Sequence, residues 1–102
     1  MKILWSQVAL SRFSEMIDYI AIDSPVQAEK WSMNILKTIK QLEAFPKSGR
    51  VVPEVGIDTI RELISGNYRI IYEMSENHIS ILTLRHCKRL LNKDELQISD
   101  DN

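Results

Sequence analysis

The stretch from Ile60 to Arg89, IRELISGNYRIIYEMSENHISILTLRHCKR, decides the fold of this chain. In its middle run every second position from 68 to 74 is apolar, and two of the three positions between them are charged. This period of two is typical of a β-strand whose two faces meet different surroundings. The turn-forming triplets Ser65-Gly66-Asn67 and Ser75-Glu76-Asn77 separate this run from its neighbours. The stretch therefore predicts a three-stranded antiparallel meander.

Two amphipathic helices are predicted before the meander. Residues 2–5 form a short apolar run that indicates a first strand, and Ser6 is a helix cap. Apolar positions then recur three and four apart from residue 7 to residue 21, which is typical of one buried helical face. Ser24-Pro25 marks the start of a second helix, because Ser caps it and Pro at the first position loses no hydrogen bond. Phe45-Pro46 ends that helix.

These elements give the order β-α-α-β-β-β, an α+β fold. We expect the helical hairpin to pack on one face of an antiparallel sheet, with the first strand at an edge and residues 47–56 as a shaped loop. The opposite face is then at least partly uncovered. Arg61, Arg69 and Arg85 fall on neighbouring strands, and guanidinium groups suit a polyanion or an acidic partner better than a core. We expect this open face to carry them.

Size and composition predict a single soluble domain. The chain has 102 residues, of which 44% are hydrophobic and 26% charged, enough for one modest core. No apolar run approaches the roughly 20 residues of a membrane helix, and the N-terminus shows no signal peptide. Cys87 is the only cysteine, which fits a reduced, cytoplasmic setting and gives no metal-binding spacing with two histidines. We expect neither a metal nor another cofactor.

The net charge of −1 hides an asymmetry along the chain. The last nine residues hold four acidic side chains and no Lys or Arg, so residues 1–93 carry 13 basic against 10 acidic side chains. We therefore predict a mildly basic domain over residues 1–93, followed by an acidic polar tail over residues 94–102.

Short motifs in this order resemble toxins of the RelE/ParE superfamily, from bacterial type II toxin–antitoxin modules. They span residue 3 to about residue 91: Ser24-Pro25, Phe45-Pro46, Gly49-Arg50, Pro53-Glu54, Arg61-Glu62, Tyr68-Arg69-Ile70-Ile71-Tyr72, and Arg85-His86 with Arg89. The resemblance implies a RelE/ParE-like fold and a cognate antitoxin that neutralises the toxin. DNA binding in such modules normally belongs to the antitoxin, and we expect no sequence-specific DNA binding by this chain.

The resemblance leaves the cellular target open between branches of the superfamily. ParE-like members inhibit DNA gyrase, whereas RelE-like members cleave mRNA on the ribosome. The GRxxPE loop and the Arg61-Glu62 pair favour the ParE-like branch. RelE-like nucleases carry lysines where Ile60-Arg61-Glu62 stands, and a further Arg and a C-terminal Tyr where Cys87 and about Lys93 fall. A third alternative is a weakly toxic relative that acts mainly in antitoxin binding and autoregulation.

Each alternative assigns different roles to the candidate site residues. A protein-binding toxin would engage its target or antitoxin through five arginines: Arg50, Arg61, Arg69, Arg85 and Arg89. A metal-independent, ribosome-dependent endoribonuclease would use Arg69 for the phosphate, with Glu54 and His86 as proton carriers. These residues also have structural interpretations. Arg69 pairs across the sheet with Glu62 or Glu73, Glu54 fixes its loop through Arg50 or backbone N–H groups, and His86 caps a strand end.

Overall fold

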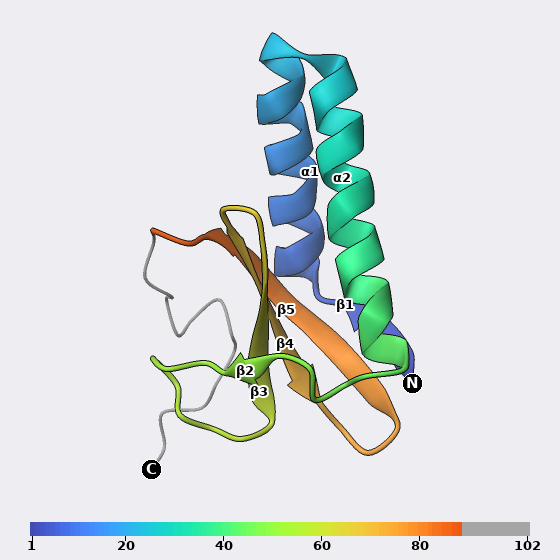
Figure 1. The fold of residues 1–102 in the computed structure, drawn as a ribbon, viewed down its shortest axis with the longest axis vertical. Coiled ribbons are helices and arrows are strands. Elements are labelled where there is room, and N and C mark those ends of the chain that lie inside the picture. The colour runs from blue at the N-terminus through green and yellow to red at the C-terminus, as the bar shows by residue number, and fades with distance from the viewer. Residues whose placement is uncertain (89–102) are drawn as a thin grey trace.

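Two antiparallel helices stand against one face of a five-stranded sheet and extend beyond its edge (Figure 1). The structure, a computed structural model, describes residues 1–88, so Arg89 and the tail expected over residues 94–102 lie outside the described residues. The elements are β1 (Lys2–Trp5), α1 (Gln7–Asp23), α2 (Pro25–Lys40), the short 3-10 helix η1 (Gln41–Glu43), β2 (Arg50–Val51), β3 (Ile60–Ser65), β4 (Tyr68–Met74) and β5 (His78–His86). This α+β architecture confirms the predicted fold class.

Serine caps fix both helix starts where the sequence predicts them. The Ser6 hydroxyl accepts a hydrogen bond of 3.0 Å from the N–H of Ala9, and the Ser24 hydroxyl accepts one of 3.1 Å from the N–H of Gln27. Ser24 is the single residue between α1 and α2, so the chain reverses at once and the helices form a hairpin. No helix within residues 1–88 is both long and apolar enough to cross a bilayer.

The sheet has the order β1-β5-β4-β3-β2 and contains the predicted antiparallel meander β3-β4-β5. The prediction of an antiparallel sheet is wrong at one edge, however, because β1 pairs with β5 in parallel. The helical hairpin is part of the crossover that a parallel pair requires, since it carries the chain from β1 to the far edge of the sheet. The predicted loop over residues 47–56 also contains β2, two residues long, paired with β3.

A bulge in β5 joins the helical layer to the sheet. Ile71 pairs with Thr83 and Tyr72 pairs with Ile81, so Leu82 is the extra residue. Ser6 bonds to this point twice: its N–H donates to the carbonyl of Ile81 at 2.9 Å, and its hydroxyl donates to the carbonyl of Leu82 at 2.7 Å. The junction between β1 and α1 is thereby fixed on β5.

Two apolar clusters pack on opposite faces of the sheet. The larger lies under the helices and holds buried residues from α1, α2, η1, β4 and β5: Ala9, Ile35, Ile39, Leu42, Ile70, Tyr72, Ile79, Ile81 and Leu84. The smaller lies on the other face, where Val52 and Val55 of the 52–59 loop pack on Ile60, Ile71 and Leu82. The face expected to be open is therefore covered in part by the chain's own loop.

Candidate functional site

The sheet register divides the predicted arginines between the two faces. Arg69 lies directly opposite Arg85 in the β4–β5 pair, so these two share the face away from the helices. Arg61 lies opposite Tyr72, whose ring belongs to the core under the helices. The expectation that Arg61, Arg69 and Arg85 share one surface is therefore wrong for Arg61. Alternation along β3 puts its neighbour Glu62 on the Arg69 face instead.

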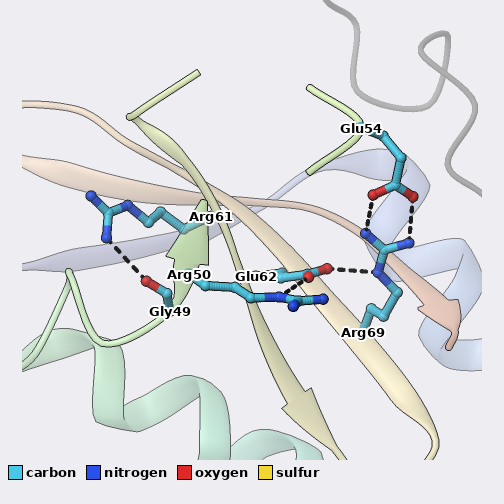
Figure 2. A network of polar contacts seen from close by, with 6 residues as sticks. All are labelled: Gly49, Arg50, Glu54, Arg61, Glu62 and Arg69. Atoms are coloured by element: carbon cyan, nitrogen blue, oxygen red, sulfur yellow. Dashed lines mark hydrogen bonds and ion pairs between the residues drawn. The ribbon is translucent and has the colours of Figure 1, made fainter. Parts of the chain in front are cut away.

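A network of two arginines and two glutamates occupies that face (Figure 2). Arg69 donates two hydrogen bonds to the carboxylate of Glu54, of 2.7 and 2.8 Å, and its Nε–H donates to Glu62 at 2.6 Å. The Nε–H of Arg50 donates to the second oxygen of Glu62, also at 2.6 Å. The interpretation of Arg69 as a cross-sheet partner of Glu62 is confirmed. Glu54 fixes its loop through Arg69, whereas Arg50 binds Glu62.

Burial makes the centre of this network an internal ion pair. Arg69 is 6% exposed and Glu62 only 1% exposed. The hydrogen bonds to Glu54 raise the pKa of Arg69 above its ordinary value, burial acts in the opposite direction, and Glu62 adds to the rise. Arg69 therefore stays charged at every accessible pH, and its charge is balanced within the protein. Breaking such a pair is costly because it leaves one buried charge without a partner.

Arg61 holds the β2–β3 connection on the other face. It donates to the carbonyl and to the carboxylate of Asp58, both at 2.9 Å, and to the carbonyl of Gly49 at 3.1 Å. Its side chain is 16% exposed, against 66% for Arg50. Of these two arginines, Arg50 therefore has the more exposed guanidinium. Arg89, the last of the five predicted binding arginines, lies outside the described part of the chain.

The three predicted catalytic residues do not all lie together. Arg69 and Glu54 are in direct contact, but His86 lies opposite Tyr68, on the side of the sheet that the helices cover. The rings of His86 and Tyr68 are 5.4 Å apart, and Tyr68 in turn lies 5.1 Å from Trp31 of α2. The Nδ1 atom of His86 accepts a hydrogen bond of 3.2 Å from the N–H of Lys88, which supports its interpretation as a residue that caps the strand end.

A cleft of about 580 Å³ between α1 and the end of β5 is a feature that the motifs do not predict. Its lining combines aromatic, aliphatic and basic residues: Arg12, Met16, Tyr19, Tyr68, Leu84, Arg85, His86 and Lys88. Arg12, Met16 and Tyr19 are spaced four and three apart, so one stripe of α1 supplies one wall. This helical spacing is the feature of the sequence from which the α1 wall of the cleft could have been predicted. Within residues 1–88, no group of three or more His, Cys, Asp or Glu is arranged to hold a metal.

Comparisons with known proteins agree on one superfamily of toxins. The sequence profile described as "ParE toxin of type II toxin-antitoxin system, parDE" matches residues 3–91. The protein "Toxin RelE2" of Caulobacter vibrioides is 28% identical over 90 residues, which cover 87% of this chain and 98% of that protein. A solved chain from the "Chromosomal ParDE TA system from P. aeruginosa" has the same fold, with a TM-score of 0.72 at 20% identity over 86% of this chain and 97% of that one. The chain therefore belongs to the ParE toxin family of the RelE/ParE superfamily and is the toxin of a type II toxin–antitoxin system.

Proposed function

We propose that this toxin arrests growth by binding DNA gyrase and that it acts as a protein-binding toxin rather than as a nuclease. The observation that carries the proposal is the state of Arg69. Each of its three guanidinium nitrogens donates to a carboxylate, at 2.6 to 2.8 Å. A scissile phosphate would have to displace Glu54 and then lie beside Glu62, whose side chain is fully buried and negatively charged.

The proton carriers of the nuclease alternative are also poorly arranged for joint catalysis. A general acid and a general base must both reach the reacting group, within hydrogen-bond distance or through one water. Glu54 is bound to Arg69 on one face of the sheet, while His86 contacts Tyr68 on the other. Protein binding requires no such pair. The match to the parDE family favours gyrase as the target, since ParE-like members inhibit that enzyme.

Arg50 is the residue that we expect to contact the target. It lies on the short edge strand β2, and its side chain is 66% exposed although its Nε–H is held by Glu62. Within residues 1–88 only the Nε atom of this guanidinium is bound, and a guanidinium already fixed at one nitrogen loses little side-chain entropy when a partner binds the other two. Arginine is also among the residues that dominate interface energies.

The test uses the purified toxin in two assays. We expect it to inhibit supercoiling by purified gyrase and to leave mRNA intact on translating ribosomes. Arg50→Ala should weaken inhibition about tenfold, as loss of 1–2 kcal/mol at an interface arginine implies. Lys37→Ala on the exposed face of α2 is the matched control and should not weaken it. Cleavage of mRNA without gyrase inhibition would reverse the assignment.

The antitoxin supplies a separate check on the weakly toxic alternative. Expression of the toxin alone should stop growth, and co-expression of the cognate antitoxin should restore it with recovery of a stable complex. If expression of the toxin alone leaves growth unchanged, the chain acts mainly in antitoxin binding and autoregulation, and the gyrase proposal fails.

A further inference from the structure

Glu54 occupies the terminal nitrogens of Arg69 in the way that a bound ligand would. Its two carboxylate oxygens accept parallel hydrogen bonds of 2.7 and 2.8 Å from the two Nη atoms (Figure 2). This fork-to-fork geometry is the one by which arginine recognises a carboxylate of any origin. Glu54 comes from the loop after β2, whereas Arg69 belongs to strand β4. The arginine is therefore part of the sheet, and the carboxylate that it binds comes from a loop.

Contacts other than those with Glu54 hold the Arg69 side chain in place. The Nε–H of Arg69 is fixed at 2.6 Å by Glu62, and Glu62 is itself held by Arg50 from the other side. The side chain of Arg69 is 7% exposed, whereas that of Glu54 is 28% exposed. Glu54 therefore lies between the guanidinium and solvent, and its departure would open the two Nη atoms without moving Arg69.

We propose that the Nη atoms of Arg69 form a carboxylate-binding seat, which Glu54 fills from within the chain and which an acidic side chain of a protein partner takes over. With Glu54 in place, ion pairs join two arginines to two glutamates on this face of the sheet. When Glu54 leaves, one positive charge is uncovered beside the exposed Arg50. The seat thus offers an additional positive charge to an acidic partner that competes with Glu54.

A carboxylate fits this seat better than a phosphate does. Glu62 shares the same guanidinium and is only 1% exposed, so its negative charge acts through a medium of low dielectric. A monoanion of the shape of Glu54 replaces the charge that Glu54 supplied, whereas a phosphate dianion adds one further negative charge next to Glu62. The inference rests on the proposed protein-binding function but not on gyrase as the target.

The loop geometry permits the exchange. Glu54 is exposed, and the turn that carries it is closed by its own backbone bonds, from the N–H groups of Val55 and Gly56 to the carbonyl of Val52 at 3.1 and 2.9 Å. Val52 is fully buried in the smaller core and anchors this turn. Rotation of the Glu54 side chain therefore empties the seat while the loop backbone stays in place.

Chemical rescue of Glu54→Ala in the full-length toxin tests the seat, with acetate as the probe. Thermal unfolding is followed in acetate, chloride and phosphate at one ionic strength and pH 7.5. Acetate should raise the Tm of Glu54→Ala above its value in chloride, by roughly 2 °C when the acetate concentration equals Kd. Phosphate should raise it less, and an NMR titration should shift the Arg69 guanidinium protons in acetate only. Should Glu54→Ala be unfolded at room temperature, Glu54→Ser supplies the same measurement.

The controls separate a seat from a general salt effect. Asp58→Ala removes the exposed carboxylate that pairs with Arg61, so acetate should not raise the Tm of this variant, and neither should it raise that of the unaltered toxin. No acetate effect in Glu54→Ala or Glu54→Ser, or an equal effect in Asp58→Ala, overturns the proposal. A larger effect of phosphate also overturns it, because the seat would then select the other oxyanion. Since the probe is a small ion, failure here leaves the gyrase assay unaffected.

Discussion

The backbone N–H of Gly49 donates a hydrogen bond of 2.9 Å to the buried hydroxyl of Tyr72, which in turn donates to the carbonyl of Pro46 at 2.7 Å. This chain of two bonds ties the segment after η1 to the centre of the sheet. The close approach of these groups also explains why residue 49 of the Gly49-Arg50 motif is a glycine. A Cβ at residue 49 would lie 2.5 Å from the carbonyl oxygen of Glu62 and 2.6 Å from the Tyr72 hydroxyl.

Gly49→Ala should be strongly destabilising because the closest atom belongs to the backbone of β3 and cannot move aside. We expect a loss at the upper end of overpacking costs, about 3 kcal/mol. Gly56→Ala is the comparison: its φ is +70° but nothing lies within 4 Å of the added methyl, so it should cost only about 1 kcal/mol of backbone strain. Urea unfolding of both variants measures the difference. Equal losses would show that crowding at Gly49 is relieved by relaxation.

Stability above pH 10 should depend on Tyr72. Burial raises the pKa of its hydroxyl above the ordinary 10.0, while the Gly49 N–H and the charge of Arg61 act in the opposite direction. The folded state therefore holds the proton after the unfolded state has released it. This contribution is fully present below pH 10 and is lost as the pH rises toward the folded pKa, at up to about 1.4 kcal/mol per pH unit.

Tyr72→Phe isolates that contribution from the other groups that titrate in alkali. The variant should lose about 1–3 kcal/mol at pH 7, because the N–H of Gly49 and the carbonyl of Pro46 lose their partner. Between pH 10 and 12 its free energy of unfolding should fall less steeply than that of the unaltered protein. Parallel curves in urea titrations across this range would contradict the account.

The two serine caps should differ in their contribution to the free energy of unfolding. Ser6 caps α1 and also donates to the carbonyl of Leu82 at the β5 bulge, whereas the Ser24 cap bond is exposed. Ser6→Ala should therefore cost about 2 kcal/mol and Ser24→Ala about 1 kcal/mol. Chemical denaturation of the two variants tests this order, and the reverse order would show that the bulge gains nothing from Ser6.

Local signals in the sequence predict most of the fold. The caps at Ser6 and Ser24, the stop at Phe45-Pro46 and the two turns of the meander all lie within a few residues of what they determine. The parallel pairing of β1 with β5 is not local. Lys2 meets His78 across most of the chain, and a four-residue strand carries no pattern that distinguishes a parallel from an antiparallel neighbour.

The site was predictable in part, for the same reason. Alternation within β4 predicts that Arg69 faces away from the helices, but the register between strands decides that Glu62 rather than Arg61 joins it there. Glu54 and Arg69 are fifteen positions apart in the sequence, and the 52–59 loop that carries Glu54 has no periodicity. The sequence alone therefore predicts an arginine available for binding, where the fold balances that arginine with two carboxylates.

Replacing Arg69 and Glu62 as a unit should separate the structural cost of this ion pair from the role of Arg69 in activity. Arg69→Ala alone should cost about 3–5 kcal/mol, since it leaves Glu62 buried without its main partner. Arg69→Met combined with Glu62→Met removes both charges and nearly preserves the volume, so the double variant should stay within roughly 2 kcal/mol of the unaltered protein. Glu54 and Arg50 remain hydrated at the surface, because their side chains are 28% and 66% exposed. A protein-binding toxin should lose at most the part of its affinity that the Arg69 seat supplies and should still arrest growth in this form, whereas a nuclease that binds phosphate through Arg69 would be inactive. Circular dichroism and thermal unfolding establish that the variant is folded, and growth curves under induction then decide between the two roles.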